Sequence, residues 1–396
     1  MNEIEKYIAE QNYDEAVQEC LRHNLNHLGV LLSNITSAPS HHVVKQFHTN
    51  INGIKTDGKI VEENIQSYEI DENPPLISDE ETEEVEPVIT VKLLTNWTSS
   101  ESLRDVWNKM SQGNYTWNNI RLVTDDDPDY FVVVNAPPTG VSPDPSKTIV
   151  FQMEPWMEQH KDQWKEWATP DPSKFFKVCC HKTDYNNNEW HLSKTYNELK
   201  TETIVKNNDL DGIVSTVLSA KYSDPGHVKR IDFVKYLEKQ KFPVHVFGDN
   251  KWGYLDYKGS LPYHQKDNAM FPYKYVFNCE NNSIKNYYTE KLIDGILAEC
   301  LVFYSGCYNI KEFIDERAFV YLELNNFEDD YKKVKEAVEG NLWEERIPYI
   351  RREKFRILNH LQFFPRLDRI INKTEGKPYD ESEYLEKIKK EKTEDV

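Results

Sequence analysis

One stretch in the second half of the sequence gathers polar and charged side chains between two apolar segments. Glu280 and Asn281 follow the apolar run 275–277, and Glu290 and Lys291 come after an asparagine-rich segment. A polar loop of this kind lies at the carboxyl end of a strand and at the amino end of a helix, where α/β sheets bind phosphorylated ligands. The stretch therefore predicts a site for such a ligand.

The residues around this loop predict one strand–helix–strand unit. The β-prone run 275–277 forms the first strand and the run 300–304 the second, and Thr289 is a suitable N-cap for the helix between them. The apolar positions of that helix have helical spacing. They are Leu292, Ile293, Ile296 and Leu297. On spacing alone, an ordinary buried βαβ unit with a polar loop explains the same pattern.

The stretch also resembles the donor-binding signature of the α-1,3-fucosyltransferases, glycosyltransferase family 10. That signature is Glu-Asn-Ser, four further residues, and then Tyr-x-Thr-Glu-Lys. The residues that match at the same spacing are Glu280, Asn281, Tyr287, Thr289, Glu290 and Lys291. Asn282 stands in place of the serine, and the family's Val-Pro-Val after the helix is absent, which affects the floor of the donor pocket.

The resemblance, which covers roughly residues 88–372, implies a fold and an activity. The fold is α/β, with two Rossmann-like domains facing a cleft (GT-B type). The activity is inverting transfer of fucose from GDP-fucose to a hydroxyl of a saccharide acceptor. A different nucleotide-activated deoxyhexose as donor is an alternative, and so is a non-catalytic glycan- or protein-binding adaptor on the same fold.

Glu154 is the candidate catalytic base. It follows the strand-like run 148–153 in the phrase Met-Glu-Pro, and the family's presumed base is the Glu of a similar phrase, Met-Glu-Ser-Pro. A carboxylate removes a hydroxyl proton near neutral pH if partial burial raises its pKa. The alternative for Glu154 is a surface glutamate that caps the next helix.

Arg230 and Lys291 are the candidates to hold the departing diphosphate. Arginine can bind phosphate oxygens with two parallel hydrogen bonds, and Lys291 adds a point charge at a helix amino end, where the dipole favours anions. The segment 228–239 also resembles a family helix that follows a donor-contacting loop. Lys229 replaces Arg230 if the register shifts by one residue. Because these cations supply the charge, no cofactor and no essential divalent metal are expected.

The resemblance further implies that Asn281, Tyr287 and Glu290 frame the nucleoside and the sugar. Glu280 is a donor-binding candidate whose alternative role is to brace the loop.

Two further residues are candidates to line the cleft. Thr289 belongs to the signature, and Tyr196 falls where the family has a tyrosine, although it could equally be a core residue.

Composition limits the other functions. The chain has 396 residues and a formal net charge of −19, which argues against nucleic acid and anionic membranes as partners. Its six cysteines have no regular spacing, and Cys179-Cys180 beside His181 is a weak metal candidate, so no metal site is predicted. Neither a signal peptide nor a membrane span is visible, as in the soluble bacterial and large-virus members of the family, and a cytoplasmic location is expected.

The chain divides into five predicted parts. A helical accessory region at 1–60 is a candidate surface for a protein partner or for self-association, and an acidic linker follows at 61–87. The acceptor-side domain spans 88–200 and the nucleotide-sugar domain 201–372, whose end (350–371) is expected to form one packing helix. A charged, frayed tail is expected at 373–396. The cluster Asp125–Asp127 is interpreted as a solvated strand entrance, because it precedes its strand.

Overall fold

The structure, a computed structural model, describes residues 87–155, 157–186, 189–262 and 264–394. The predicted helical region 1–60 and the acidic linker, except for its last residue, lie outside these residues. Both therefore stay predictions.

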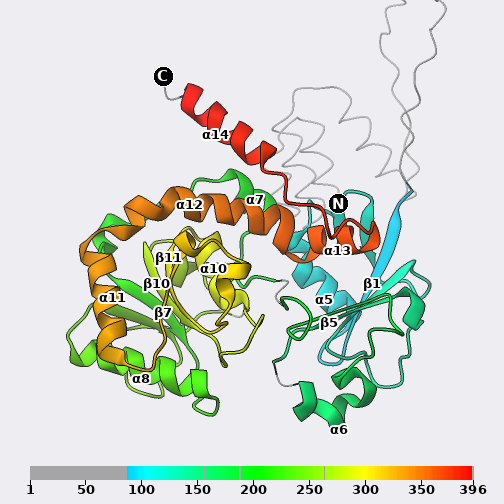
Figure 1. Ribbon diagram of the computed structural model, residues 1–396, viewed down its shortest axis with the longest axis horizontal. Coiled ribbons are helices and arrows are strands. Elements are labelled where there is room, and N and C mark those ends of the chain that lie inside the picture. Colours follow the sequence, from blue (N-terminus) through cyan, green and yellow to red (C-terminus); the bar gives the residue numbers. More distant parts are fainter. Residues whose placement is uncertain (1–86, 156, 187–188, 263, 395–396) are drawn as a thin grey trace, which may run out of the picture. The chain divides into compact units, whose positions relative to one another are not determined.

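The first domain, which contains β1 and β5 (Figure 1), is built on a six-stranded sheet with the strand order β2-β3-β1-β4-β5-β6. All neighbouring strands are parallel except the short pair β2 and β3. The strands are β1 (Ile89–Thr95), β2 (Thr116–Trp117), β3 (Ile120–Val123), β4 (Tyr130–Val134), β5 (Thr148–Gln152) and β6 (Lys177–Cys180). Helices cover parallel sheets, so central strands such as β5 are buried along their whole length.

The second domain has a fully parallel six-stranded sheet with the order β12-β11-β10-β7-β8-β9. Its strands are β7 (Val214–Leu218), β8 (Val244–Gly248), β9 (Tyr257–Gly259), β10 (Tyr275–Cys279), β11 (Leu301–Ser305) and β12 (Phe319–Tyr321). The chain builds outward from β7 in one direction and then crosses back to place β10 on its other side. This reversal of strand order creates a crevice between β7 and β10 at their carboxyl ends.

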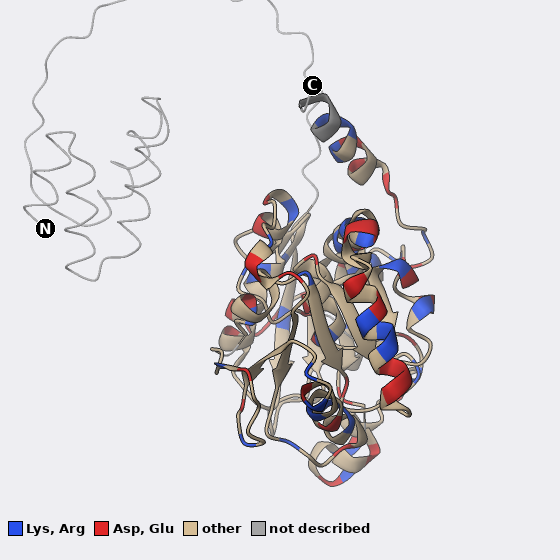
Figure 2. Cartoon of the chain, turned by 90° about the vertical axis from the view of Figure 1, so that its left-hand side faces the viewer, with Lys and Arg blue, Asp and Glu red and all other residues tan. Residues whose placement is uncertain are grey.

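Most of the helices lie against these sheets, whereas α14 projects away from them, and the charged residues lie on helices and loops with few on the strands (Figure 2). The helices are α5 (Ser100–Trp107), α6 (Lys161–Trp164), α7 (Tyr196–Thr201), α8 (Pro225–Lys239), α9 (Asp267–Met270), α10 (Glu290–Leu297), α11 (Phe327–Glu339), α12 (Leu342–Arg356), α13 (Phe363–Ile371) and α14 (Ser382–Glu394). Among the described residues, no helix combines the length and the apolar character that crossing a membrane requires. The predicted fold class, α/β with two Rossmann-like domains of GT-B type, is confirmed.

The prediction of a single helix over residues 350–371 is wrong. A π-helical turn at Ile357–Leu361 follows α12, and the chain then extends at Gln362 before α13 begins. The side chain of Gln362 accepts a hydrogen bond from the backbone N–H of Phe364 at 2.9 Å, which caps the new helix. The predicted packing face is confirmed, because Phe355, Ile357, Leu358 and Leu361 are all buried.

Helix α13 packs against the first domain, although its sequence follows the second. The ring of Phe363 lies 4.6 Å from that of Trp107 and 5.9 Å from that of Phe151. Arg366 donates a hydrogen bond to Asp184 at 2.8 Å. The end of the segment 201–372 thus belongs structurally to both domains.

Two further expectations need correction. The tail is not frayed throughout, because α14 forms, and Lys387 on this helix donates a hydrogen bond to the carbonyl of Lys200 at 2.7 Å. The cluster Asp125–Asp127 does follow a strand, since the four-residue β3 precedes it. Asp126 is nevertheless fully exposed and pairs with Lys92 at 2.7 Å, as a solvated strand entrance would.

Candidate functional site

A pocket of about 300 Å³ lies at the carboxyl ends of β7 and β10, where the strand order of the second sheet reverses. Open parallel sheets bind ligands at such points. Of the predicted donor-binding residues, the structure brings Arg230, Asn281, Glu290 and Lys291 to this pocket. The remaining lining residues are Thr216, Val217, Leu218, Ser219, Lys221, His227, Lys266, Phe277, Asn278 and Cys279.

The pocket gathers positive charge in an acidic protein. Its lining includes the cations Lys221, Arg230, Lys266 and Lys291 but only one carboxylate, that of Glu290. The whole chain carries a formal net charge of −19. Concentrated positive charge on a partly enclosed wall attracts and holds anions. The arrangement therefore suits a ligand with more than one negative charge.

Arg230 is held rigidly at the wall of this pocket. It lies in the second turn of α8 with only 6% of its surface exposed. One terminal nitrogen donates to the amide oxygen of Asn281 at 3.2 Å and to the carbonyl of Cys279 at 3.4 Å, and the other donates to the hydroxyl of Ser219 at 2.9 Å. These contacts fix the plane of the guanidinium before any ligand arrives.

No carboxylate forms an ion pair with Arg230 among the described residues, and its Nε has no hydrogen-bond partner there. Burial lowers the pKa of Arg230 below its usual value, because the charged form has lost water. A buried charge without an ion-pair partner costs several kcal/mol of folding free energy. A bound anion would offset this cost. The neighbouring Lys229 instead donates to Asn325 at 2.8 Å, so the register places Arg230, not Lys229, in the pocket.

Lys291 lies opposite, at the first turn of α10, in a network of charges. Its Nζ is 3.0 Å from the carboxylate of Glu290, which also lies 3.4 Å from Lys266. Lys266 in turn pairs with the fully buried Asp294 at 2.7 Å. Burial alone would raise the pKa of Glu290, but Lys291 and Lys266 outweigh it and hold that pKa well below its usual range. Glu290 is therefore a charged hydrogen-bond acceptor inside the pocket.

Glu280 braces the loop and does not line the pocket. It is 1% exposed, and its two carboxylate oxygens accept hydrogen bonds from the backbone N–H and the hydroxyl of Thr289, at 2.8 and 2.7 Å. Thr289 is the N-cap of α10, as its sequence context predicts. Gly306 makes room for this carboxylate, because a Cβ there would lie 2.4 Å from Cγ of Glu280. The bracing alternative thus describes what Glu280 does in this structure.

The loop that carries these residues also contacts the first domain. Asn286 donates a hydrogen bond to the carbonyl of His181 at 2.9 Å, and the rings of Tyr288 and Tyr185 stack at 5.7 Å. Tyr287 is buried beside them. Burial raises the pKa of the Tyr287 phenol well above its usual range, and the carboxylates of Glu280 and Glu154, among others, act in the same direction. Tyr287 therefore lies within electrostatic reach of both the donor loop and Glu154.

Glu154 lies two residues beyond β5, at the carboxyl edge of the first sheet. The preceding residue is anchored on both sides: the N–H of Met153 donates to the side chain of Asn135, and Asn186 donates to the Met153 carbonyl, each at 2.8 Å. The carboxylate of Glu154 itself is exposed, so the partial burial expected for a base is not present here. Its position is fixed by the backbone, whereas its side chain faces solvent.

Tyr196 lies in the core and does not line the donor pocket. It is 4% exposed, its hydroxyl donates to Asn359 at 2.7 Å, and its ring meets that of Trp117 at 5.0 Å. Thr289 likewise acts as a cap and is not part of the pocket lining.

Sequence reasoning missed six residues with polar or charged side chains that line the pocket, namely Thr216, Ser219, Lys221, His227, Lys266 and Asn278. Ser219 and Lys221 directly follow β7, so a prediction of the strand order would have pointed to them. His227 lies in the first turn of α8, one turn before Arg230. Lys266 comes from irregular chain before α9, and no local pattern marks it.

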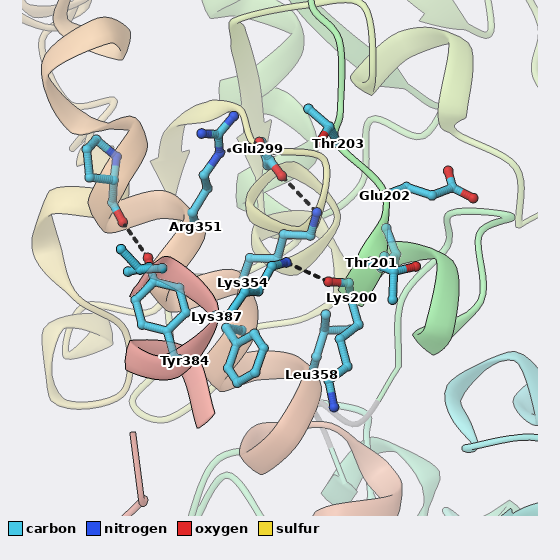
Figure 3. Close-up of a pocket in the computed structure, with 14 residues that line it drawn as sticks. Lys200, Thr201, Glu202, Thr203, Glu299, Arg351, Lys354, Leu358, Tyr384 and Lys387 are labelled. Carbon is cyan, nitrogen blue, oxygen red and sulfur yellow. Dashed lines mark hydrogen bonds and ion pairs between the residues drawn. The ribbon is translucent and has the colours of Figure 1, made fainter. Parts of the chain in front are cut away.

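A second hollow, of about 380 Å³, lies between α7, α12 and α14 (Figure 3). Its cations already have partners. Lys354 and Arg351 both bind Glu299 at 2.9 Å, and Lys200 pairs with Glu383 at 2.6 Å. These three cations are neutralised by carboxylates, whereas Arg230 forms no ion pair among the described residues, so this hollow is less suited to an anion than the pocket around Arg230.

Comparisons with known proteins address the same region. Residues 211–340 match the sequence model of "Glycosyltransferase family 10 (fucosyltransferase) C-term". A comparison with curated protein sequences finds no match.

Solved structures similar to this chain include three glycosyltransferases. The first is an α1,3-fucosyltransferase solved with GDP, which is 17% identical to this chain. The alignment covers 74% of this chain and 94% of the fucosyltransferase, with a TM-score of 0.42. An α-glucosyltransferase solved with UDP and a 13-mer DNA shares 10% identity over 72% of this chain and 100% of its own, with a TM-score of 0.46. A glycosyltransferase from Rickettsia africae shares 13% identity over 68% and 76%, with a TM-score of 0.32.

The family match spans β7 to α11 and contains all the residues that line the pocket, together with the Glu280-Asn281 signature. The match confirms the resemblance of the signature residues to glycosyltransferase family 10. Residues 211–340 are therefore identified as a glycosyltransferase family 10 domain, which supports a glycosyltransferase.

Proposed function

We propose that this protein transfers fucose from GDP-β-L-fucose to a hydroxyl of a saccharide, with inversion at the sugar carbon. The observation that carries the proposal is the pocket at the β7–β10 switch point, where Arg230 and Lys291 lie on adjacent crossovers of a family 10 domain. A nucleoside diphosphate leaves with several negative charges. Preformed cations at that position stabilise the charge as it develops.

The proposed reaction is a single displacement. The acceptor oxygen forms a bond to C1 of fucose while the bond from C1 to the diphosphate oxygen breaks, and the electron pair of that bond leaves with GDP. The acceptor hydroxyl gives its proton to the carboxylate of Glu154. The transition state resembles an oxocarbenium ion, as in glycoside hydrolysis.

Each pocket residue then has a defined task. The guanidinium of Arg230 is already held by Ser219 and Asn281, and it donates N–H hydrogen bonds to the diphosphate. Lys291 adds a second positive charge. Glu290 accepts hydrogen bonds from ribose or sugar hydroxyls, because its carboxylate stays charged at neutral pH. With this much positive charge from side chains, the diphosphate needs no metal ion for neutralisation.

Glu154 is proposed as base on its position at the carboxyl edge of β5 and its proximity to Tyr287. An acceptor saccharide bound over Glu154 would exclude water from the carboxylate.

Thermal unfolding with a panel of nucleotides tests the donor assignment. A ligand present at about 100 times its dissociation constant stabilises the folded state by about 2.7 kcal/mol. We expect stabilisation by GDP and GDP-fucose, and not by UDP, ADP or dTDP, followed by release of GDP from GDP-fucose on turnover. Stabilisation by another nucleotide alone would overturn fucose as the transferred sugar. Stabilisation without turnover would favour a non-catalytic adaptor.

A further inference from the structure

A cluster of three potential metal ligands lies beside the donor pocket and is not part of the proposed transfer. Glu189 and His191 come from the segment before α7, and His264 comes from the segment before α9. One ligand atom from each of these residues lies within 4.8 Å of the other two. We propose that Glu189, His191 and His264 form a binding site for a Zn²⁺-type transition-metal ion.

The spacing of two of these ligands already fits a tetrahedral ion. Nε2 of His191 lies 3.3 Å from Oε1 of Glu189. In a tetrahedral site with metal–ligand bonds of about 2.0–2.1 Å, neighbouring ligand atoms are about 3.3–3.4 Å apart. The rings of His191 and His264 have centroids 3.9 Å apart, so the third ligand lies next to this pair. Two imidazoles and one carboxylate are a ligand set that Zn²⁺ prefers.

The groups around these ligands would orient them. Trp107 donates its indole N–H to Oε2 of Glu189 at 2.9 Å, which leaves Oε1 directed towards His191. The other ring nitrogen of His191, Nδ1, lies 3.9 Å from the carboxylate of Glu290. Metal-binding histidines usually donate their second N–H to a carboxylate, a backbone carbonyl or a water molecule, which fixes the ring and strengthens the ligand. The backbone N–H of His191 is also held, at 2.7 Å, by the buried Asp294.

The charge around the cluster can accept a cation. The carboxylates of Glu189, Asp267, Glu290 and Asp294 act on this region, against the ammonium groups of Lys109, Lys266 and Lys291. Four acids against three lysines leave one negative charge before the histidines are counted. The lysines therefore do not make the region positive overall, so a divalent cation is not repelled from it.

A bound ion would link the two domains beside the donor helix. Glu189 already contacts Trp107 of α5 in the first domain, whereas His264 precedes α9 and Glu290 begins α10 in the second. The ion would be separate from the diphosphate pocket and would act by fixing His191 next to Glu290. The proposal departs from the sequence-based expectation of no metal site, which rested on ligand spacing along the chain.

Binding of Co²⁺ and Zn²⁺ to the untagged full chain, after removal of metals with a chelator, tests this site. We expect one equivalent of Co²⁺ to give the intense visible absorption of a tetrahedral site, and Zn²⁺ to displace it. The variants His264→Gln and Glu189→Gln should each weaken binding by at least about tenfold. His160→Gln, a histidine outside the cluster, should leave it unchanged.

The wild-type spectrum decides the matter if a variant fails to fold. The absence of a saturable site, or the weak absorption of an octahedral Co²⁺ ion, would overturn the proposal. Equal Zn²⁺ affinity in wild type and both folded cluster variants would also overturn it. Metal binding is measured directly here, so the result does not depend on which nucleotide sugar the protein uses.

Discussion

Glu280 holds the amino end of α10 through Thr289, because its two carboxylate oxygens accept both the backbone N–H and the hydroxyl of that residue. This pair fixes the position of Lys291, whose Nζ lies 3.2 Å from the Thr289 hydroxyl and 3.7 Å from the Glu280 carboxylate. The brace therefore connects the buried strand end to a cation in the pocket.

Replacing Glu280 with glutamine should disturb this brace. A glutamine can accept only with one of its two terminal atoms, so its amide N–H₂ would face a donor on Thr289. We expect a loss of about 1–3 kcal/mol in the free energy of unfolding, together with weaker binding of GDP. Denaturant unfolding and a GDP titration measure the two effects. Glu336→Gln, on the exposed face of α11, is the control and should change neither quantity. An unchanged stability of Glu280→Gln would show that the brace is dispensable.

Arg230→Lys tests the planar, preorganised guanidinium. Lysine keeps the charge but cannot hold Ser219 and Asn281 while also binding two phosphate oxygens. Loss of a charged hydrogen bond worth about 1.5–3 kcal/mol corresponds to roughly 10–100-fold weaker binding of GDP. The matched control is Lys229→Met, because Lys229 contacts Asn325 and not the pocket. If both variants bound GDP equally well, Arg230 would have no role in holding the diphosphate.

Local sequence patterns predicted the parts of this site that lie close together along the chain. The N-cap role of Thr289 and the helix that follows it depend on neighbouring residues, so their spacing was sufficient. Strand β10 was predicted for the same reason, as an apolar run before a polar loop.

The rest of the site depends on contacts between segments that are distant in sequence. Lys266 reaches the pocket because it pairs with the buried Asp294. No local sequence pattern around either residue predicts this ion pair. The return of α13 to the first domain follows from the packing of Phe363 on Trp107. Such contacts become visible only when the strand order and the helix positions are known.

Gly226→Ala should separate α8 from the donor loop. A Cβ at this position would lie 1.8 Å from the backbone oxygen of Glu280 and 2.7 Å from the backbone of Asn281, so the first turn of α8 would have to move. This movement would break the hydrogen bond from Gly226 to the Asn281 carbonyl, now 2.9 Å long, and displace Arg230. We expect lower thermal stability and weak or absent binding of GDP. Gly376→Ala, where a Cβ would meet open space, is the control and should behave as wild type.

The stability of the fold should depend on His360 in weakly acidic solution. Burial, with the nearby Arg369 and Arg356, lowers the pKa of His360 from 6.5 to about 4. Between these two values the unfolded chain binds a proton that the folded protein excludes, so this residue reduces stability as the pH falls from 6.5 towards 4. Each pKa unit corresponds to about 1.4 kcal/mol. Relative to wild type, His360→Gln should therefore gain stability as the pH is lowered through this window.

Unfolding by denaturant at several pH values between 8 and 4 measures this effect. At pH 8 the imidazole is neutral in both states, so the difference between the two proteins there gives the cost of the substitution itself. If the stability curves of wild type and variant stay parallel down to pH 4, His360 does not contribute to the acid sensitivity.

Glu154→Gln tests the proposed base directly. The amide keeps the size of the side chain and cannot accept the proton of the attacking hydroxyl. Loss of a general base typically reduces the rate by about 10²–10⁴-fold, so release of GDP from GDP-fucose should fall by this amount. Binding of GDP should change little, because Glu154 belongs to the first sheet and the pocket to the second. Glu158→Gln, an exposed neighbour paired with Lys182, is the control. A Glu154→Gln protein that keeps most of its turnover would remove Glu154 as the base and direct attention to the carboxylate of Glu290, which lies at the donor itself.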